Sequence, residues 1–190
     1  MRACGGSGKM RIVVMLALLL AACSPSGPPR IVEPRLKEQP ARGLSLLRQA
    51  MLDGHNRARA AVGVAPLVWD DTLAAHALSY ARTLAAEHRF EHAVQPMGPG
   101  REGENLWTGT RGAYRYDEMV GGFVDEKRFF RNGVTPDFST TGKWEDVAHY
   151  TQIVWRGTTR FGCALASNAR DDYLVCRYTP PGNVVGEVAF

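Results

Sequence analysis

One stretch of the sequence decides the fold: HYTQIVWR, residues His149–Arg156. Aromatic and β-branched side chains dominate this stretch, a composition typical of buried strands. We therefore predict a strand over 148–155, with His149 on the same face as Ile153 and Trp155 because side chains alternate with a period of two. An imidazole at the open end of such a strand is a ligand held on a rigid element. His149 is thus the first candidate functional residue.

The segment after this stretch keeps the period of two and predicts a hairpin. Strands are expected over 160–167 and 172–178, with a turn over 168–171. A turn at the centre of that loop places Cys163 directly opposite Cys176, at a separation that allows a disulfide. Two free buried thiols are the alternative. Export from the cytoplasm favours the bridge, and the two other cysteines lie near the N-terminus in segments with another role.

The segments before the stretch have the spacing of helices. Apolar residues recur every three or four positions from Leu44 to Val62, and Gly63 is a stop signal. A second helix should begin after a capping aspartate near residue 70 and run to about Arg89. A weaker helix is expected over 116–130, where two adjacent glycines lower the helix propensity.

Several short motifs occur together in the order of one known family. They are His55-Asn56-x-x-Arg59, Gly63-Val64-x-Pro66-Leu67-x-Trp69-Asp70, Leu73-Ala74, Tyr80-Ala81, His92, Gly103-Glu104-Asn105-Leu106, Glu126, His149 to Arg156, Gly162-Cys163-Ala164 and Cys176-x-Tyr178-x-Pro180-x-Gly182-Asn183. Together they resemble the CAP superfamily of cysteine-rich secretory, venom-allergen and plant pathogenesis-related proteins. The resemblance implies an α+β domain over 44–190, a three-layer α-β-α sandwich with helices on both faces of a mostly antiparallel central sheet.

The same resemblance implies a central cleft lined by His92, Glu104, Glu126 and His149. Neutral imidazoles are good ligands for Zn²⁺, and glutamates coordinate a metal directly or hold a metal-bound water. Zn²⁺ or another divalent metal is therefore the expected cofactor. A metal-dependent hydrolase, such as a peptidase, would use Glu104 or Glu126 as its catalytic base. In a third interpretation the quartet only stabilises the fold of a structural or adhesion protein.

Two positions depart from the family's pattern. Ala93 stands where many members have a serine directly after the first cleft histidine, so a serine nucleophile is missing there. Phe123 stands where relatives often carry tryptophan, three residues before Glu126. We expect a binding module rather than an enzyme, with a lipid, glycan or peptide as its ligand.

A different motif competes for His92. Residues His88–His92 match the H-x-x-E-H pattern of inverted zinc peptidases, in which two imidazoles one helical turn apart bind the metal. The glycines and prolines of 96–100 follow directly and argue against a regular helix there. The two histidines upstream, His55 and His76, are expected to be packing or surface residues.

The N-terminal segment predicts where the protein works. Ile12–Ala22 is an apolar run behind basic residues, as in a signal peptide over 1–22, with Met10 as an alternative start. Leu20-Ala21-Ala22-Cys23 resembles a bacterial lipobox, which implies lipidation of Cys23 and a membrane anchor. An ordinary cleavage site with an incidental cysteine is the alternative. The proline-rich segment 23–43 is expected to be a tether without fixed structure.

Charge excludes one class of partner. Residues 1–22 hold three of the 23 lysines and arginines and none of the 19 acidic residues, so the remaining chain carries 20 − 19 = +1. No basic block with interleaved aromatic residues is present, so nucleic-acid binding has no support in the sequence. The sequence thus predicts an envelope-anchored binding protein, on an outer membrane or facing the periplasm.

Overall fold

The computed structural model describes residues 32–34 and 37–190, and Val32–Phe190 forms one compact unit. The predicted signal peptide and Cys23 lie outside the described residues. Within the described part of the chain, no helix is both long and apolar enough to span a bilayer.

Four strands form the central sheet. They are β1 (Val68–Trp69), β2 (Gly103–Thr110), β3 (Arg160–Ser167) and β4 (Asp171–Thr179), in the spatial order β1-β3-β4-β2. The short β1 pairs with β3 in parallel, whereas β3–β4 and β4–β2 are antiparallel. The mostly antiparallel sheet is therefore confirmed, and β2 is an edge strand.

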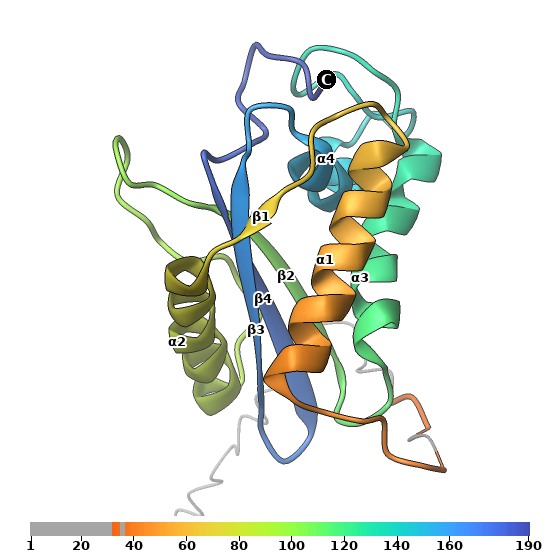
Figure 1. The fold of residues 1–190 in the computed structure, drawn as a ribbon, viewed down its shortest axis with the longest axis vertical. Coiled ribbons are helices and arrows are strands. Elements are labelled where there is room, and N and C mark those ends of the chain that lie inside the picture. Colours follow the sequence, from red (N-terminus) through yellow and green to blue (C-terminus); the bar gives the residue numbers. More distant parts are fainter. Residues whose placement is uncertain (1–31, 35–36) are drawn as a thin grey trace, which may run out of the picture. The chain divides into compact units, whose positions relative to one another are not determined.

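Helices cover both faces of the sheet, as Figure 1 shows. They are α1 (Leu44–Ala60), α2 (Asp71–Glu87), α3 (Tyr116–Asp125) and α4 (Ala148–Val154), with 3₁₀ turns η1 (Glu126–Phe129) and η2 (Trp144–Val147). Helix α2 packs on β3 and β4, whereas α1, α3 and α4 lie on the opposite face. The predicted three-layer arrangement is confirmed.

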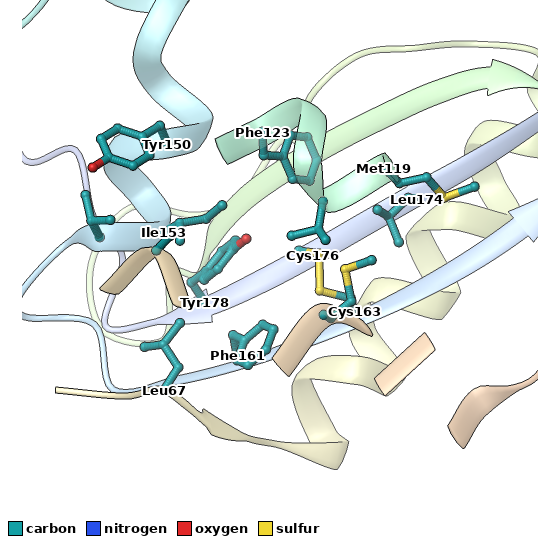
Figure 2. Packing of buried hydrophobic residues seen from close by; sticks show 14 of the residues in the cluster. Leu67, Met119, Phe123, Tyr150, Ile153, Phe161, Cys163, Leu174, Cys176 and Tyr178 are labelled. Atoms are coloured by element: carbon teal, nitrogen blue, oxygen red, sulfur yellow. A yellow bond between two sulfur atoms is a disulfide. The ribbon is translucent and has the colours of Figure 1, made fainter. Parts of the chain in front are cut away.

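Side-chain alternation along the strands divides the core into two layers. On β4, Tyr173 and Val175 face α2, whereas Leu174, Cys176 and Tyr178 face the other helices. Figure 2 shows the larger of the two clusters, which surrounds the disulfide. On the α2 side, four alanines pack together with Leu84, Leu106, Tyr173 and Val175.

Close packing on the α2 side depends on one glycine. A Cβ at Gly162 would meet the backbone of Asp70 and Ala74, so only glycine lets α2 approach β3 this closely. Asp70 also caps α2, accepting hydrogen bonds from the backbone N–H groups of Thr72 and Leu73 at 2.9 and 3.1 Å.

The hairpin prediction is confirmed in its register. Cys163 lies opposite Cys176 across β3 and β4, and the two form a disulfide. The predicted strand 160–167 has the observed bounds, and the last strand is longer than predicted by one residue at each end.

The strand predicted over 148–155 is wrong, because the segment forms α4. Its β propensity is overridden by tertiary contacts. The Glu126 carboxylate accepts hydrogen bonds from the backbone N–H groups of His149 and Tyr150 at 3.0 and 3.1 Å, which satisfies donors at the helix N-terminus. Residues 150–155 are all buried, as the composition predicted.

Smaller differences concern the other helix ends. Helix α2 ends at Glu87, two residues before its predicted end, because His88 adopts a left-handed conformation. The predicted helix 116–130 is α3 followed by the tighter η1 turn. That turn places Glu126 beside α4.

A buried arginine ties α1 to the segment after α4. Arg59 donates hydrogen bonds to the carbonyls of Ala65, Ile153, Trp155 and Thr158 at 2.6 to 3.0 Å. Burial lowers the pKa of Arg59 to about 10, so the group stays protonated at neutral pH. One side chain thereby joins the loop after α1 to the end of α4 and to the loop that follows α4.

The segment before α1 is not a free tether throughout. Glu33 accepts a hydrogen bond from the Thr110 hydroxyl at 2.6 Å, and Arg42 pairs with the buried carboxylate of Asp172 at 3.0 Å. The described residues of 32–43 therefore lie against the domain at these points, contrary to the expected lack of fixed structure.

Candidate metal centre

The four predicted cleft residues form two histidine–carboxylate pairs. Nδ1 of His92 lies 2.7 Å from Oε1 of Glu104, and Nδ1 of His149 lies 2.6 Å from Oε1 of Glu126. A carboxylate accepts, so each Nδ1 carries the proton and each Nε2 carries the lone pair when the ring is neutral. This is the arrangement by which carboxylates orient metal-binding histidines.

His149 is held by the start of α4. Its partner Glu126 uses one carboxylate oxygen for the ring and the other for the backbone N–H groups of His149 and Tyr150. The ring also stacks on Phe123, with 4.8 Å between centroids and 23° between planes. Three contacts thus orient a side chain that remains 28% exposed.

His92 lies on a loop and depends on a buried anchor. Its partner Glu104 on β2 is only 5% exposed, whereas the His92 side chain is 65% exposed. The Ala93 backbone N–H donates to the same Glu104 oxygen at 2.9 Å. Arg177, directly opposite on β4, approaches the other oxygen at 2.8 Å. The loop is therefore positioned by a strand.

The Arg177–Glu104 contact is an ion pair without the alignment of a hydrogen bond. Among the described residues, neither Oε2 of Glu104 nor Nε of Arg177 has a hydrogen-bond partner. The short distance and strong burial make the attraction between the charges the better description. Arg177 therefore balances the buried Glu104 carboxylate.

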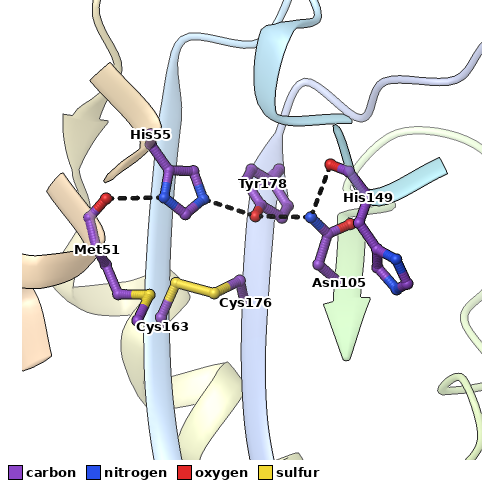
Figure 3. Close-up of a disulfide and its surroundings, with 7 residues drawn as sticks. All are labelled: Met51, His55, Asn105, His149, Cys163, Cys176 and Tyr178. Atoms are coloured by element: carbon purple, nitrogen blue, oxygen red, sulfur yellow. Dashed lines mark hydrogen bonds between the residues drawn. A yellow bond between two sulfur atoms is a disulfide. The ribbon is translucent and has the colours of Figure 1, made fainter. Parts of the chain in front are cut away.

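The first residues of β2 bring the two pairs to one edge of the sheet. Glu104 faces the α2 side with Arg177, whereas the next side chain, Asn105, donates to the carbonyl of His149 at 3.1 Å (Figure 3). A Cβ at Gly103 would collide with the Gln152 side chain of α4. Glycine at this position lets α4 approach the edge strand.

The quartet does not form a cage of four ligands. In the described chain, no three of these residues bring their ligand atoms within 4.8 Å of one another. Both glutamates are occupied by histidine and by backbone or Arg177. Two potential metal-ligand atoms remain, Nε2 of His92 and Nε2 of His149. Neither has a hydrogen-bond partner among the described residues.

A third pair of the same kind adjoins His92, and the sequence did not indicate it. Nδ1 of His76 on α2 lies 2.6 Å from Oε1 of Glu102, whose other oxygen is 3.5 Å from Arg177. Arg177 thereby links Glu102 and Glu104. In the sequence, the only available signal of this pair was the two-residue spacing of Glu102 and Glu104. The β2–β4 register that places Arg177 beside both glutamates is a long-range feature.

The inverted-peptidase motif has no structural basis. Helix α2 ends before His88, so His88 and His92 are not one helical turn apart. Nδ1 of His88 lies 3.2 Å from the Asn168 amide at the β3–β4 turn. The β3–β4 turn directly precedes β4, whereas Glu104 on β2 pairs with Arg177 near the last residue of β4. The two imidazoles therefore contact different parts of the domain.

One group of three metal-ligand atoms does occur in the described chain: His55, Cys163 and Cys176, all buried, with ligand atoms within 4.8 Å of one another. The two sulfurs form the disulfide, so neither is a thiolate. His55 lies 2.7 Å from the Met51 carbonyl through Nδ1 and 2.8 Å from the Tyr178 hydroxyl through Nε2 (Figure 3). Burial lowers the pKa of His55 to about 3, which keeps the ring neutral. The expectation that His55 is a packing residue is confirmed.

A cavity lies between α1 and α3, and no histidine lines it. Its volume is about 560 Å³, and Leu46, Ala50 and Ala58 of α1 face Val120 and Val124 of α3 across it. Polar side chains border it: Gln49, Asp53, Arg57, Arg115, Asp117 and Lys127. The groove is therefore apolar with a charged rim.

Solved structures share this fold at low sequence identity. The crystal structure of NaASP2 with Zn²⁺ aligns over 83% of this chain and 90% of its own, with a TM-score of 0.62 and 21% identity. The Schistosoma mansoni venom allergen-like protein 4 aligns over 76% and 96%, with a TM-score of 0.58 and 20% identity.

Sequence relatives are closer. Pathogenesis-related protein 1A of Nicotiana tabacum is 42% identical over 141 residues, which cover 74% of this chain and 79% of the relative. A pathogenesis-related protein of PR-1 type from Sambucus nigra is 38% identical over 140 residues, covering 73% and 79%. The family model for CAP, the cysteine-rich secretory protein family, matches residues 52–178. The chain therefore belongs to the CAP, or cysteine-rich secretory protein, family.

Proposed function

We propose that this CAP domain is a non-enzymatic binding module that holds a divalent metal ion, such as Zn²⁺, through Nε2 of His92 and Nε2 of His149. One observation carries the proposal: each ring donates from Nδ1 to a carboxylate, which leaves Nε2 as the ligand atom. Both pairs meet the same edge of the sheet at neighbouring residues of β2. Two imidazoles and water suit a borderline divalent ion.

The glutamates support binding better than hydrolysis. A general base needs a free carboxylate oxygen within reach of a water. Glu126 uses its two oxygens for the His149 ring and two backbone N–H groups. Glu104 is buried between His92, Ala93 and Arg177. Both therefore orient ligands, and the metal-dependent hydrolase remains the second interpretation.

Calorimetric titration of Zn²⁺ into the purified protein tests the metal site. His92→Ala and His149→Ala should each weaken binding at least tenfold, because each removes one of two imidazole ligands. His88→Ala is the matched control, since His88 contacts the β3–β4 turn. Wild-type binding should also weaken in acid, because a protonated imidazole has no lone pair for the metal.

Other outcomes assign other roles. Loss of Zn²⁺ binding in His88→Ala with retention in His149→Ala would contradict the site. If the wild type binds no metal, the pairs only stabilise the fold. Turnover of a peptide that disappears in Glu126→Gln while Zn²⁺ is still bound would favour the hydrolase.

The α1–α3 groove favours a lipid over a glycan or peptide as a second ligand. Its walls are aliphatic, and only its rim carries charges such as those of Arg57 and Lys127. A single-chain lipid with an acidic head buries its tail against such walls and pairs its head with a basic side chain. No histidine lines the groove, and its lining residues Tyr150 and Lys127 directly follow His149 and Glu126 in the sequence.

A fatty acid with a fluorescent label tests the groove. Val124→Trp places a bulky ring between α1 and α3 and should weaken binding at least tenfold. Val185→Trp is the control, because Val185 is 79% exposed and does not line the groove. Equal affinities for both variants and the wild type would place the lipid elsewhere or show only surface adsorption.

We also propose that the module works at a bacterial cell envelope, held by lipid on Cys23. The lipobox sequence and the proline-rich segment behind it support this, and both begin outside the described residues.

A further inference from the structure

Three residue side chains with potential metal-ligand atoms lie together in the core: one imidazole and the two disulfide sulfurs. His55 and the sulfurs of Cys163 and Cys176 bring their ligand atoms within 4.8 Å of one another, and each residue is at most 2% exposed. Figure 3 shows the imidazole above the disulfide, with its two nitrogens directed to Met51 and Tyr178. This cluster is distinct from the His92 and His149 pairs.

The oxidation state of the cysteines decides whether the cluster can bind a metal. Sulfurs in a disulfide are poor ligands, whereas thiolates bind Zn²⁺ strongly. An exported chain reaches an oxidising compartment with its cysteines still reduced. Until the bridge forms, the fold therefore holds two thiols and an imidazole at one buried point.

The imidazole already has the required tautomer. A carbonyl only accepts, so Nδ1–H of His55 donates to the Met51 carbonyl. Nε2 therefore has the lone pair and accepts from the Tyr178 hydroxyl. A metal at Nε2 would displace that one hydrogen bond, and Tyr178 would keep the hydrogen bond from Asn105 at 3.1 Å.

We propose that the Cys163–Cys176 disulfide closes a latent metal site, in which the reduced chain binds a thiophilic ion such as Zn²⁺ through both thiolates and His55. Reduction by a dithiol supplies two electrons and two protons, breaks the S–S bond and converts the dithiol to a disulfide. Metal uptake then releases the two thiol protons. The two thiolate charges balance the divalent ion, so the buried group is neutral. Oxidation and metal binding exclude each other.

Cobalt spectroscopy on the full chain carrying Cys4→Ser and Cys23→Ser tests the site, because only two cysteines remain. The protein is unfolded, reduced with a phosphine and refolded with Co²⁺. A thiolate-to-cobalt absorption band should appear, saturate at about one equivalent and disappear when Zn²⁺ is added. The oxidised protein should show no band. Zn²⁺ should also raise the thermal unfolding midpoint of the reduced protein, since binding to the folded state stabilises it.

Two variants separate this site from others. His92→Ala with His149→Ala should leave the band unchanged, even if the proposed function fails. His55→Leu should weaken Co²⁺ binding at least tenfold, because it removes the imidazole ligand. A reduced protein without the thiolate band, folded or not, would overturn the inference. A band without any rise in the unfolding midpoint would overturn it as well, because the metal would then be bound by an unfolded chain.

Discussion

Burial separates two histidines that look alike in the sequence. His55 is fully buried and hydrogen-bonded through both ring nitrogens, and its pKa is lowered to about 3. His149 is partly exposed and pairs with a carboxylate through one nitrogen only. The first is suited to joining α1 to β4, and the second keeps a nitrogen for a ligand.

The buried imidazole makes stability depend on pH. Between pH 6.5 and about 3, His55 binds a proton in the unfolded chain but not in the folded one. Acid therefore favours unfolding, and this contribution to stability is fully present above pH 6.5 and falls as the pH decreases. The free energy of unfolding should drop by about 2 kcal/mol between pH 6.5 and 5 from this group. Urea unfolding of the oxidised, metal-free protein at both pH values measures it.

The control for this prediction is His55→Gln, which cannot titrate. Its absolute stability should be lower because the contacts to Met51 and Tyr178 change. The drop in unfolding free energy between the two pH values should nevertheless shrink by about 2 kcal/mol relative to the wild type. Equal drops in both proteins would show that other groups cause the acid sensitivity.

At the level of elements, α4 depends on what surrounds it. Glu126 from η1 satisfies donors at its start, and the Gln152 side chain accepts from the backbone N–H of Gly182 at 2.9 Å. The Thr151 hydroxyl bonds back to Val147 at 3.0 Å, a helical contact that offsets its β-branched character. Glu126 and Gly182 are too far from α4 in the sequence for a local pattern to reveal these contacts.

Two glycine substitutions test the packing of α4 on β2. Gly103→Ala should lower the free energy of unfolding by about 1–3 kcal/mol, because its Cβ would collide with the buried Gln152 side chain. Gly122→Ala, in α3, is the matched control. Nothing lies within 4 Å of a Cβ there, so better helix propensity should raise stability by about 0.5–1 kcal/mol. Denaturant unfolding compares them, and equal effects of the two substitutions would contradict this packing argument.

At the scale of the whole molecule, the last residues of the proline-rich segment 23–43 contact the domain close to the β3–β4 turn. Arg42 donates to the Tyr114 carbonyl and pairs with Asp172, which also accepts from the backbone N–H of Gly112 at 3.1 Å. Glu33 contacts Thr110 earlier in the chain, so the stretch between a lipid on Cys23 and the first described contact with the domain would end at Glu33. The proposed anchor would hold the domain within a short distance of the membrane.

Detergent partitioning of wild type and Cys23→Ser tests the anchor. The wild type should enter the detergent phase, and Cys23→Ser should remain in the aqueous phase because no acyl chain is added. Cys4→Ser is the control, since that residue lies in the predicted signal peptide. If Cys23→Ser still fractionates fully with membranes, the lipobox prediction fails.

The sequence by itself determined the hairpin, its register and its disulfide, because strand period and turn length set which residues face each other across a short loop. The spacing of apolar residues likewise determined α1 and most of α2. The tertiary structure decided the rest. Tertiary contacts such as those with Glu126 favour a helix over 148–154, and the β2–β4 register brings Arg177 to Glu104. Such pairings join residues tens of positions apart, and a local pattern contains no information about them.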